Sequence, residues 1–157
     1  MSSAGCLIVV SGLPGSGKTT AARKLQSERS GVRFCPDEWM AALDANLWDS
    51  ELRARIETLQ WTVALDVLRA GGTAIIEWGT WARDERERLR AGASAVGART
   101  ELLHLDVTVD TLWARIEQRG AEDPPMTRSD VVAMVEFMRG QSPDENERRV
   151  FDAVLQG

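Results

Sequence analysis

The residue types best suited to chemistry in this chain lie in a glycine-rich stretch near the N-terminus. The stretch reads Gly12-Leu13-Pro14-Gly15-Ser16-Gly17-Lys18-Thr19-Thr20. It matches the spacing G-x-x-x-x-G-K-S/T, in which glycines let backbone N–H groups turn inward around phosphate oxygens. In such a loop Lys18 would reach the β- and γ-phosphates, and the Thr19 hydroxyl would bind Mg2+. We therefore expect these residues to hold a nucleoside triphosphate.

The segments on either side of this stretch have the patterns that such a loop needs. Residues 7–10 form a short apolar run, which predicts a buried strand of a parallel sheet, and residues 19–30 predict a helix. The N-terminus of that helix would add its dipole and its free N–H groups to the phosphate site. Strand, loop and helix agree with the motif, which argues against a chance glycine-rich turn.

The rest of the chain alternates between apolar strand-like runs and helix-like segments. Further strands are expected at residues 32–35, 73–77 and 100–107, and we find no convincing fifth strand. Helices are expected at residues 50–70, 81–96, 110–119 and 127–139, and a short last helix is expected to begin after a cap at Ser142. Thr127 and Asp130 would form a capping box at the start of the helix at residues 127–139. The apolar face of the first of these helices would hold Leu52, Ile56, Leu59, Val63 and Val67. This alternation predicts an α/β fold with a parallel sheet and helices on both faces.

Composition and charge limit the kinds of partner that we expect. The 157 residues suit a single domain, residues 1–157, and 19 basic against 24 acidic residues give a net charge of −5. An acidic balance argues against a nucleic-acid partner, which usually needs a basic surface. Cys6 and Cys35 show no metal-like spacing and are expected to be buried thiols in a reducing compartment. Because no signal peptide or membrane span is visible, we expect a cytoplasmic protein with no membrane partner.

Carboxylates follow three of the predicted strands, at the edge of the sheet where ligands bind in parallel α/β folds. Asp37 follows the second strand, Glu77 ends the third, and Asp106 and Asp110 follow the fourth. Beside a triphosphate, one carboxylate could take a proton from an acceptor hydroxyl, and another could hold the water shell of Mg2+. Asp37 and Glu77 are the candidates for these two tasks.

A phosphate-binding loop, an aspartate just after the second strand and an Arg-x-x-x-Arg helix leading into a lid resemble the small P-loop kinases of the AAA_33 group. Their relatives include polynucleotide 5′-kinases, zeta-toxin-type sugar-nucleotide kinases, chloramphenicol phosphotransferase, and gluconate or shikimate kinases. The resemblance covers roughly residues 5–140. It implies a three-layer P-loop NTPase fold with four parallel strands in the order 2-3-1-4 and a short helical lid near residues 117–128. It also implies ATP and Mg2+ as cofactors.

The resemblance further implies roles for single residues. Asp37 matches the general base for the acceptor hydroxyl, although it could instead cap the helix after Pro36. Arg119 matches the arginine that clamps the phosphates from the lid, helped by Arg115 one turn earlier. A solvated helix face is the alternative for this pair. Arg128 could close over the nucleotide.

The side of the site that would hold the acceptor has few clear markers. Glu77 occupies the Walker-B-like position, where a contact to Mg2+ through water or to the acceptor competes with an ordinary strand-end charge. Polynucleotide kinases of this group carry a phosphate-gripping arginine three residues beyond the base, and this chain has Met40 there. Trp39 and Trp78 could line an acceptor pocket or pack in the core. Arg83 and Arg86 alternate with acidic residues, which indicates a solvent-facing helix, although Arg83 could instead reach the acceptor.

These observations favour a phosphotransferase acting on a sugar, a nucleoside or an antibiotic-like molecule, and two other functions stay open. A kinase acting on an RNA or DNA 5′ end would need a basic groove, which the composition does not indicate. A nucleotide-binding ATPase switch that signals to a partner protein would need a residue that positions an attacking water. Gln60 is the remaining candidate for that residue.

Overall fold

The computed structural model describes residues 4–13, 15–119 and 126–156, so Pro14 and residues 120–125 of the expected lid lie outside the described residues. The strands are β1 (Cys6–Ser11), β2 (Val32–Phe34), β3 (Thr73–Gly79), β4 (Arg99–His104) and β5 (Ala153–Val154). The helices are α1 (Lys18–Arg29), α2 (Pro36–Ala42), α3 (Ser50–Arg69), α4 (Arg83–Ala95), α5 (Val109–Arg119), α6 (Arg128–Gln141) and α7 (Glu145–Val150). Within the described ranges, no helix combines the length and the apolar character needed to cross a membrane.

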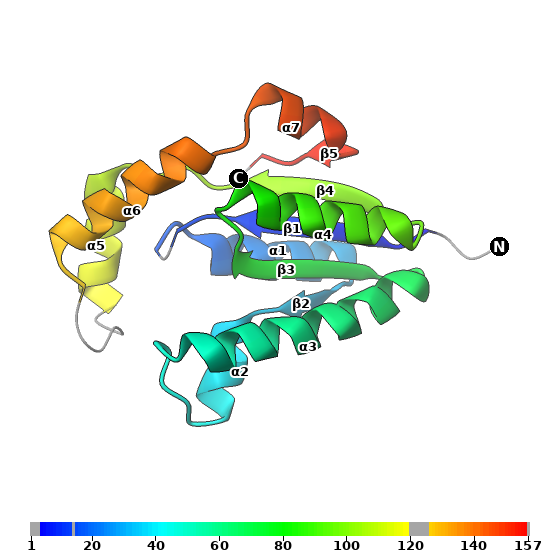
Figure 1. The fold of residues 1–157 in the computed structure, drawn as a ribbon, viewed down its shortest axis with the longest axis horizontal. Coiled ribbons are helices and arrows are strands. Elements are labelled where there is room, and N and C mark those ends of the chain that lie inside the picture. Colours follow the sequence, from blue (N-terminus) through cyan, green and yellow to red (C-terminus); the bar gives the residue numbers. More distant parts are fainter. Residues whose placement is uncertain (1–3, 14, 120–125, 157) are drawn as a thin grey trace.

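The strands form one parallel sheet in the order β2-β3-β1-β4-β5 (Figure 1). The α/β fold is confirmed, and the first four strands have the predicted order 2-3-1-4. The expectation that no fifth strand exists is wrong, because β5 pairs with β4 at the edge of the sheet. β5 spans two residues, which are too few to show the alternation that reveals a strand in a sequence.

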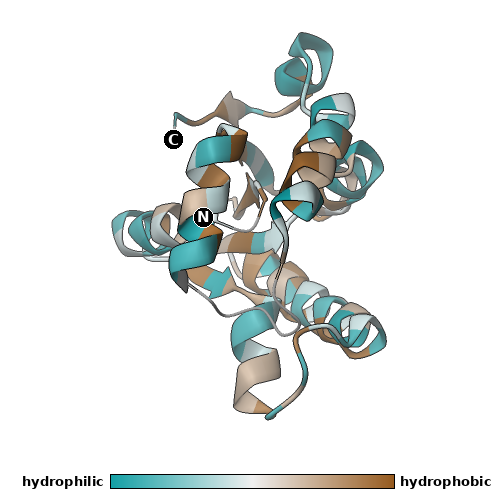
Figure 2. Ribbon diagram, turned by 90° about the vertical axis from the view of Figure 1, so that its left-hand side faces the viewer, coloured by the Kyte–Doolittle hydropathy of each residue, from teal (hydrophilic) through white to brown (hydrophobic). Residues whose placement is uncertain are grey.

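Successive residues of β1 point to opposite faces of the sheet and enter two separate cores. Leu7 and Val9 pack with residues of α3 and α4 on one face. Ile8 and Val10 pack with residues of α1 on the other face. In Figure 1, α3 and α4 lie in front of the sheet and α1 lies behind it, and Figure 2 shows apolar colour along the enclosed strands. The chain therefore has the three layers that were predicted.

A third, smaller core holds α5 and α6 together beyond the carboxyl ends of the strands. Leu112 and Ile116 of α5 pack with Val131 and Val135 of α6. Leu13 of the glycine-rich stretch belongs to the same core. This core therefore attaches the α5–α6 pair, which carries the arginines expected to bind phosphate, to the phosphate-binding loop.

The buried face of α3 differs from the predicted one. The buried residues of this helix are Ile56, Gln60, Ala64 and Leu68. Leu59 and Val63, which were expected inside, are exposed. These four residues are spaced four positions apart and so share one face of the helix. Because Gln60 is polar, this face did not have the apolar pattern by which a buried face is predicted. The prediction for Leu59 and Val63 is therefore wrong.

The ends of β3, α6 and α7 can be compared with the ends predicted from the sequence. β3 continues to Gly79, so Glu77 lies inside the strand and not at its end. Thr127 and Asp130 form the predicted capping box at the start of α6. The last helix starts after Asp144, whose side chain caps it, and not near residue 142 as predicted.

Candidate active site

The glycine-rich stretch connects β1 to α1, as its spacing predicts. Gly15 and Gly17 have φ values of 81° and 93°, a left-handed region that glycine enters without steric cost. A Cβ atom on Gly12 would lie 2.5 Å from Ser16 Oγ. A side chain would therefore strain the backbone at Gly15 and Gly17 and would crowd Ser16 at Gly12.

The first turn of α1 is open to an anion. Its N-cap residue is Gly17, and no side chain of the described residues caps the helix. Ser16 Oγ is buried and has no hydrogen-bond partner among the described residues. Free backbone N–H groups and an unpartnered hydroxyl at a helix N-terminus suit phosphate oxygens. The phosphate groups of a nucleotide therefore fit this end of α1.

Lys18 is the first residue of α1, and it is partly buried. Burial lowers the pKa of Lys18, and the nearby carboxylates of Glu77 and Asp37 act in the opposite direction. A desolvated ammonium group gains strongly from an additional anionic partner. The three charged groups lie near one another beside the loop, where an added phosphate would offset the burial of the lysine.

The Glu77 carboxylate ties the phosphate-binding loop to the sheet. Thr19 Oγ1 donates a hydrogen bond of 2.9 Å to Glu77 Oε2, and Arg33 Nη1 donates one of 3.0 Å to Glu77 Oε1. The Glu77 side chain is only 2% exposed. Arg33 also donates to both carboxylate oxygens of Glu38 at 2.6 Å. Glu77 therefore has a fixed position directly beside the Thr19 hydroxyl.

The oxygens of Thr19 and Glu77 fit a magnesium ion that is bound together with phosphates. Mg2+ prefers oxygen ligands, keeps several waters and is usually held by one or two protein groups. In the described parts of the chain, no group of three or more His, Cys, Asp or Glu side chains could hold a metal by itself. The Thr19 hydroxyl and, through water or directly, the Glu77 carboxylate would thus hold the ion, with phosphate oxygens as the other ligands.

Asp37 forms an ion pair with Arg53, a residue that sequence reasoning missed. Asp37 lies in the first turn of α2, whose N-cap residue is Cys35, and Arg53 Nη1 donates to Asp37 Oδ1. Arg53 Nε also donates a hydrogen bond of 3.2 Å to Glu57 Oε1, four residues further along α3. The i, i+4 spacing of Arg53 and Glu57 is visible in the sequence, but the contact with Asp37 is not. Because the Asp37 carboxylate bonds an arginine, capping alone does not account for this residue.

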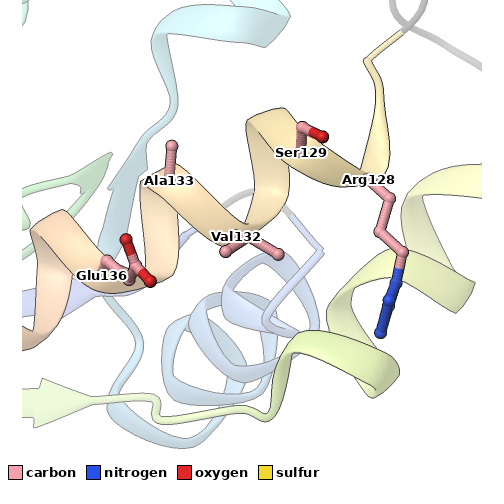
Figure 3. Close-up of a pocket in the computed structure, with 5 residues that line it drawn as sticks. All are labelled: Arg128, Ser129, Val132, Ala133 and Glu136. Atoms are coloured by element: carbon pink, nitrogen blue, oxygen red, sulfur yellow. The ribbon is translucent and has the colours of Figure 1, made fainter.

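The expected phosphate-clamping arginines lie on α5 and α6. Arg115 Nη1 donates a hydrogen bond of 3.1 Å to the carbonyl oxygen of Gly15, so Arg115 reaches the loop. Arg119 ends α5, and its side chain lies outside the described part of the structure. Arg128 Nη2 pairs with Asp110 Oδ1 at 2.5 Å, and Figure 3 shows Arg128 extending from α6 toward α5. Arg128 lines a shallow hollow with Ser129, Val132, Ala133 and Glu136 (Figure 3).

Two arginines of α4, Arg83 and Arg86, face residues near the C-terminus of the chain. Arg83 Nη1 donates to Asp144 Oδ2 at 2.9 Å, and the Arg83 backbone N–H donates to Gln141 Oε1. The structure thus places Arg83 against α7 and the end of α6. Arg86 is fully buried and pairs with Glu147, so the prediction that this arginine faces solvent is wrong. Its partner lies far along the chain, and a local charge pattern cannot reveal such a partner.

The two tryptophans expected near the acceptor have different surroundings. Trp78 is 9% exposed, and its indole N–H donates a hydrogen bond of 2.9 Å to Gln60 Oε1. Its ring meets Trp61 edge to face, with ring centroids 6.5 Å apart. Trp78 therefore packs in the core, which was the alternative to lining an acceptor pocket. Gln60 is buried beside it and accepts its indole N–H, so Gln60 is not placed to hold an attacking water at the loop. Trp39 lies on the surface of α2 and is 39% exposed.

Comparison with known sequences finds one family. The profile of the AAA_33 family, described as an AAA domain, matches residues 7–139 of the chain. Among curated proteins, none matches. The match covers the phosphate-binding loop, all of the strands except β5, and the helices up to α6.

Solved structures share the fold. A candidate kinase from Chloroflexus aurantiacus has a TM-score of 0.74 and 22% identity, over 99% of this chain and 88% of that chain. A chain of the Pnkp1/Rnl/Hen1 RNA repair complex has a TM-score of 0.74 and 20% identity, over 97% of this chain and 48% of that chain. Kti12 of Chaetomium thermophilum, solved with ADP-AlF3, has a TM-score of 0.69 and 21% identity, over 96% of this chain and 88% of that chain. The resemblance drawn from the sequence is confirmed at the level of the fold.

Proposed function

Because the chain belongs to the AAA_33 family and has a P-loop kinase-like fold, we propose that it transfers the γ-phosphate of ATP to a hydroxyl group of a small molecule. The observation that carries this proposal is the Asp37 carboxylate, held by Arg53 in the neighbourhood of Lys18. A carboxylate in that place can accept the proton of an acceptor hydroxyl. Thr19 and Glu77, which are hydrogen-bonded to each other, would supply the oxygens for Mg2+.

In the proposed reaction, the acceptor oxygen forms a bond to the γ-phosphorus while the bond from that phosphorus to the β–γ bridging oxygen breaks. Asp37 takes the proton of the hydroxyl group, and ADP leaves with the electron pair of the broken bond. Lys18 and the open N-terminus of α1 hold the phosphates in position. Mg2+, held by Thr19 and Glu77 when bound, neutralises charge on the phosphates.

The arginines of the lid complete the proposed site. Arg115 is bonded to Gly15 of the loop, and Arg119 follows one turn later on α5. A guanidinium group near the γ-phosphate would stabilise the charge that spreads over the transferring phosphoryl group. Arg128 would join the site only after leaving Asp110.

A small acceptor with hydroxyl groups suits the surroundings of Asp37. Trp39 lies two positions after Asp37 on α2 and offers an exposed aromatic face. Aromatic faces pack well on the rings of sugars and nucleosides. The net charge of −5 makes a long polyanion a less suitable partner.

The test is a transfer screen with γ-labelled ATP and Mg2+ against sugars, nucleosides, aminoglycoside and phenicol antibiotics, and 5′-hydroxyl oligonucleotides. Asp37→Asn is assayed beside Asp44→Asn, a matched change at an exposed aspartate just after α2. We expect a labelled small molecule with the parent protein and with Asp44→Asn. In Asp37→Asn the rate should fall by about 10²- to 10⁴-fold, with ATP binding retained.

A polynucleotide 5′-hydroxyl is the second candidate acceptor, and Arg53 is the observation that favours it. Met40, where polynucleotide kinases carry a phosphate-gripping arginine, is fully buried. Arg53 nevertheless brings a guanidinium group to Asp37 from α3, and such a group can bind a phosphate of the acceptor. Label on an oligonucleotide would support this candidate against a small acceptor. Slow release of free phosphate with every acceptor, unchanged in Asp37→Asn, would instead favour an ATPase switch.

A further inference from the structure

Arg86 of α4 is fully buried and joins several distant parts of the chain. Its Nε and Nη2 atoms donate to the two carboxylate oxygens of Glu147 at 2.6 and 2.8 Å. Its Nη1 atom donates to the carbonyl oxygens of Thr80 and Trp81 at 3.1 and 2.8 Å. Nη2 also donates to the carbonyl oxygen of Gln141 at 2.5 Å. Arg86 therefore connects α7 and the end of α6 to the residues that follow β3.

Thr80 has a backbone conformation that needs such support. Its φ is 31°, in a region that β-branched residues rarely enter. Residues in such conformations persist only where the surrounding structure holds them, and they gather at functional sites. Arg86 binds the carbonyl oxygens of Thr80 and of the next residue, Trp81. The buried guanidinium group thus holds the strained residue from its C-terminal side.

The same residues after β3 bind the start of the phosphate-binding loop. Ser11 Oγ donates a hydrogen bond of 3.0 Å to the Thr80 carbonyl oxygen, which also accepts from Arg86. The Gly12 N–H donates a hydrogen bond of 2.9 Å to the carbonyl oxygen of Gly79. Arg86 and Ser11, the last residue of β1, thus donate hydrogen bonds to the same acceptor, the Thr80 carbonyl oxygen. A shift of Thr80 would therefore move the first glycine of the loop.

We propose that Arg86 and Glu147 are positioning residues for the phosphate-binding loop. Through them the C-terminal segment, residues 142–156, supports the nucleotide site. The role in nucleotide binding rests on the proposed function, whereas the effect on loop order does not. A purely structural ion pair would stabilise the fold and leave the affinity for nucleotide unchanged.

The test replaces the whole pair with apolar side chains of similar volume. Removing one partner would leave a buried charge unpaired and could unfold the protein, whereas replacing both partners is often neutral for stability. The test variant is therefore Arg86→Met with Glu147→Leu. The matched control is Arg29→Met with Glu101→Leu, which removes a two-bond pair of 3.1 and 2.7 Å at the end of α1 away from Lys18.

Two readouts follow the loop: the affinity for MgATP by calorimetry, and amide hydrogen exchange at Gly12, with folding checked by circular dichroism. We expect the test variant to stay folded, to bind MgATP about tenfold more weakly and to exchange the Gly12 amide faster. The control variant should match the parent protein in both readouts. Adding Thr80→Gly to the test variant should restore part of the affinity, because glycine adopts a positive φ without strain.

Unchanged MgATP affinity together with unchanged Gly12 exchange in the folded test variant would overturn the proposal. Equal losses in the control variant would overturn it too, because they would show a general effect of destabilisation. A parent protein that binds no MgATP would count against the proposed function alone. In that case the exchange rate of the Gly12 amide still decides whether Arg86 and Glu147 position the loop.

Discussion

Arg53 on α3 holds the carboxylate of Asp37 on α2, although the two residues lie sixteen positions apart in the sequence. Arg53 also donates to Glu57 Oε1 at 3.2 Å and to the carbonyl oxygen of Trp78 on β3 at 3.4 Å. The Asp37 side chain is 50% exposed to solvent, and the Arg53 side chain is 30% exposed. A general base needs both a fixed orientation and access to its substrate, and this ion pair provides the two together.

Arg53→Met should lower kcat by about 100-fold, because Asp37 would lose its fixed orientation. The KM for ATP should stay close to that of the parent protein, since Arg53 belongs to the acceptor side of the site. Steady-state kinetics with an acceptor from the screen measures both constants. Arg55→Met, an exposed change on the same helix, serves as the control. A loss of ATP affinity as large as the loss of kcat would place Arg53 in the nucleotide site instead.

Glu77→Gln should raise the Mg2+ concentration that gives half-maximal transfer by about tenfold. Glutamine keeps an acceptor for the Thr19 hydroxyl but carries no negative charge for the ion. Titration of the rate with Mg2+ at constant ATP measures the effect. Glu38→Gln is the control, because Glu38 also bonds Arg33 but is 46% exposed. If both variants need the same Mg2+ concentration as the parent protein, Glu77 has no role in holding the ion.

Lys18→Met should weaken ATP binding by about 100-fold and make the protein without nucleotide more stable by about 1 kcal/mol. Burial lowers the pKa of Lys18 in the folded state, so the unfolded chain holds this proton more tightly. The contribution of Lys18 to the free energy of unfolding is therefore unfavourable at neutral pH and is relieved as the pH rises toward 10.5. Urea denaturation at several pH values should show the advantage of Lys18→Met shrinking over that range. An advantage that grows with pH would contradict this assignment.

The free energy of unfolding should fall as the pH rises above 9.0, because burial raises the pKa of Cys35 to about 11 and that of Cys6 to about 12. A raised pKa in the folded state contributes stability below the unfolded value, and this stability is lost as the pH rises through the folded value. Cys35→Ala should therefore show a shallower decline than the parent protein over this alkaline range. At pH near 8 both thiols should react slowly with iodoacetamide, since little thiolate is present. Rapid alkylation of either cysteine would contradict the prediction.

Trp78→Ala should lower the stability of the fold, whereas Trp39→Ala should change the binding of the acceptor. Trp78→Ala should cost about 3 to 5 kcal/mol of unfolding free energy, because it removes a large core side chain and leaves the amide of Gln60 without its partner. Trp39→Ala should leave the melting temperature nearly unchanged and raise the KM for the acceptor. Thermal unfolding and acceptor kinetics separate the two. An unchanged acceptor KM in Trp39→Ala would remove this residue from the proposed pocket.

The sequence by itself determined the features that depend on neighbouring residues. The spacing of Gly12, Gly15 and Gly17 is sufficient for the tight loop between β1 and α1, because only glycine tolerates those turns. Thr127 and Asp130 make a local capping box and so mark the start of α6. Apolar runs such as residues 73–77 reveal central strands, because strands buried on both faces are apolar throughout.

Only the tertiary structure decided which distant side chains meet. Arg53 reaches Asp37, and Arg86 is buried against Glu147, sixty-one positions away. A charged side chain lies in the interior only where a partner from another segment offsets its lost hydration. Local charge pattern does not contain that information, so it placed Arg86 in solvent. For the same reason β5, which exists only by pairing with β4, had no signal in the chain.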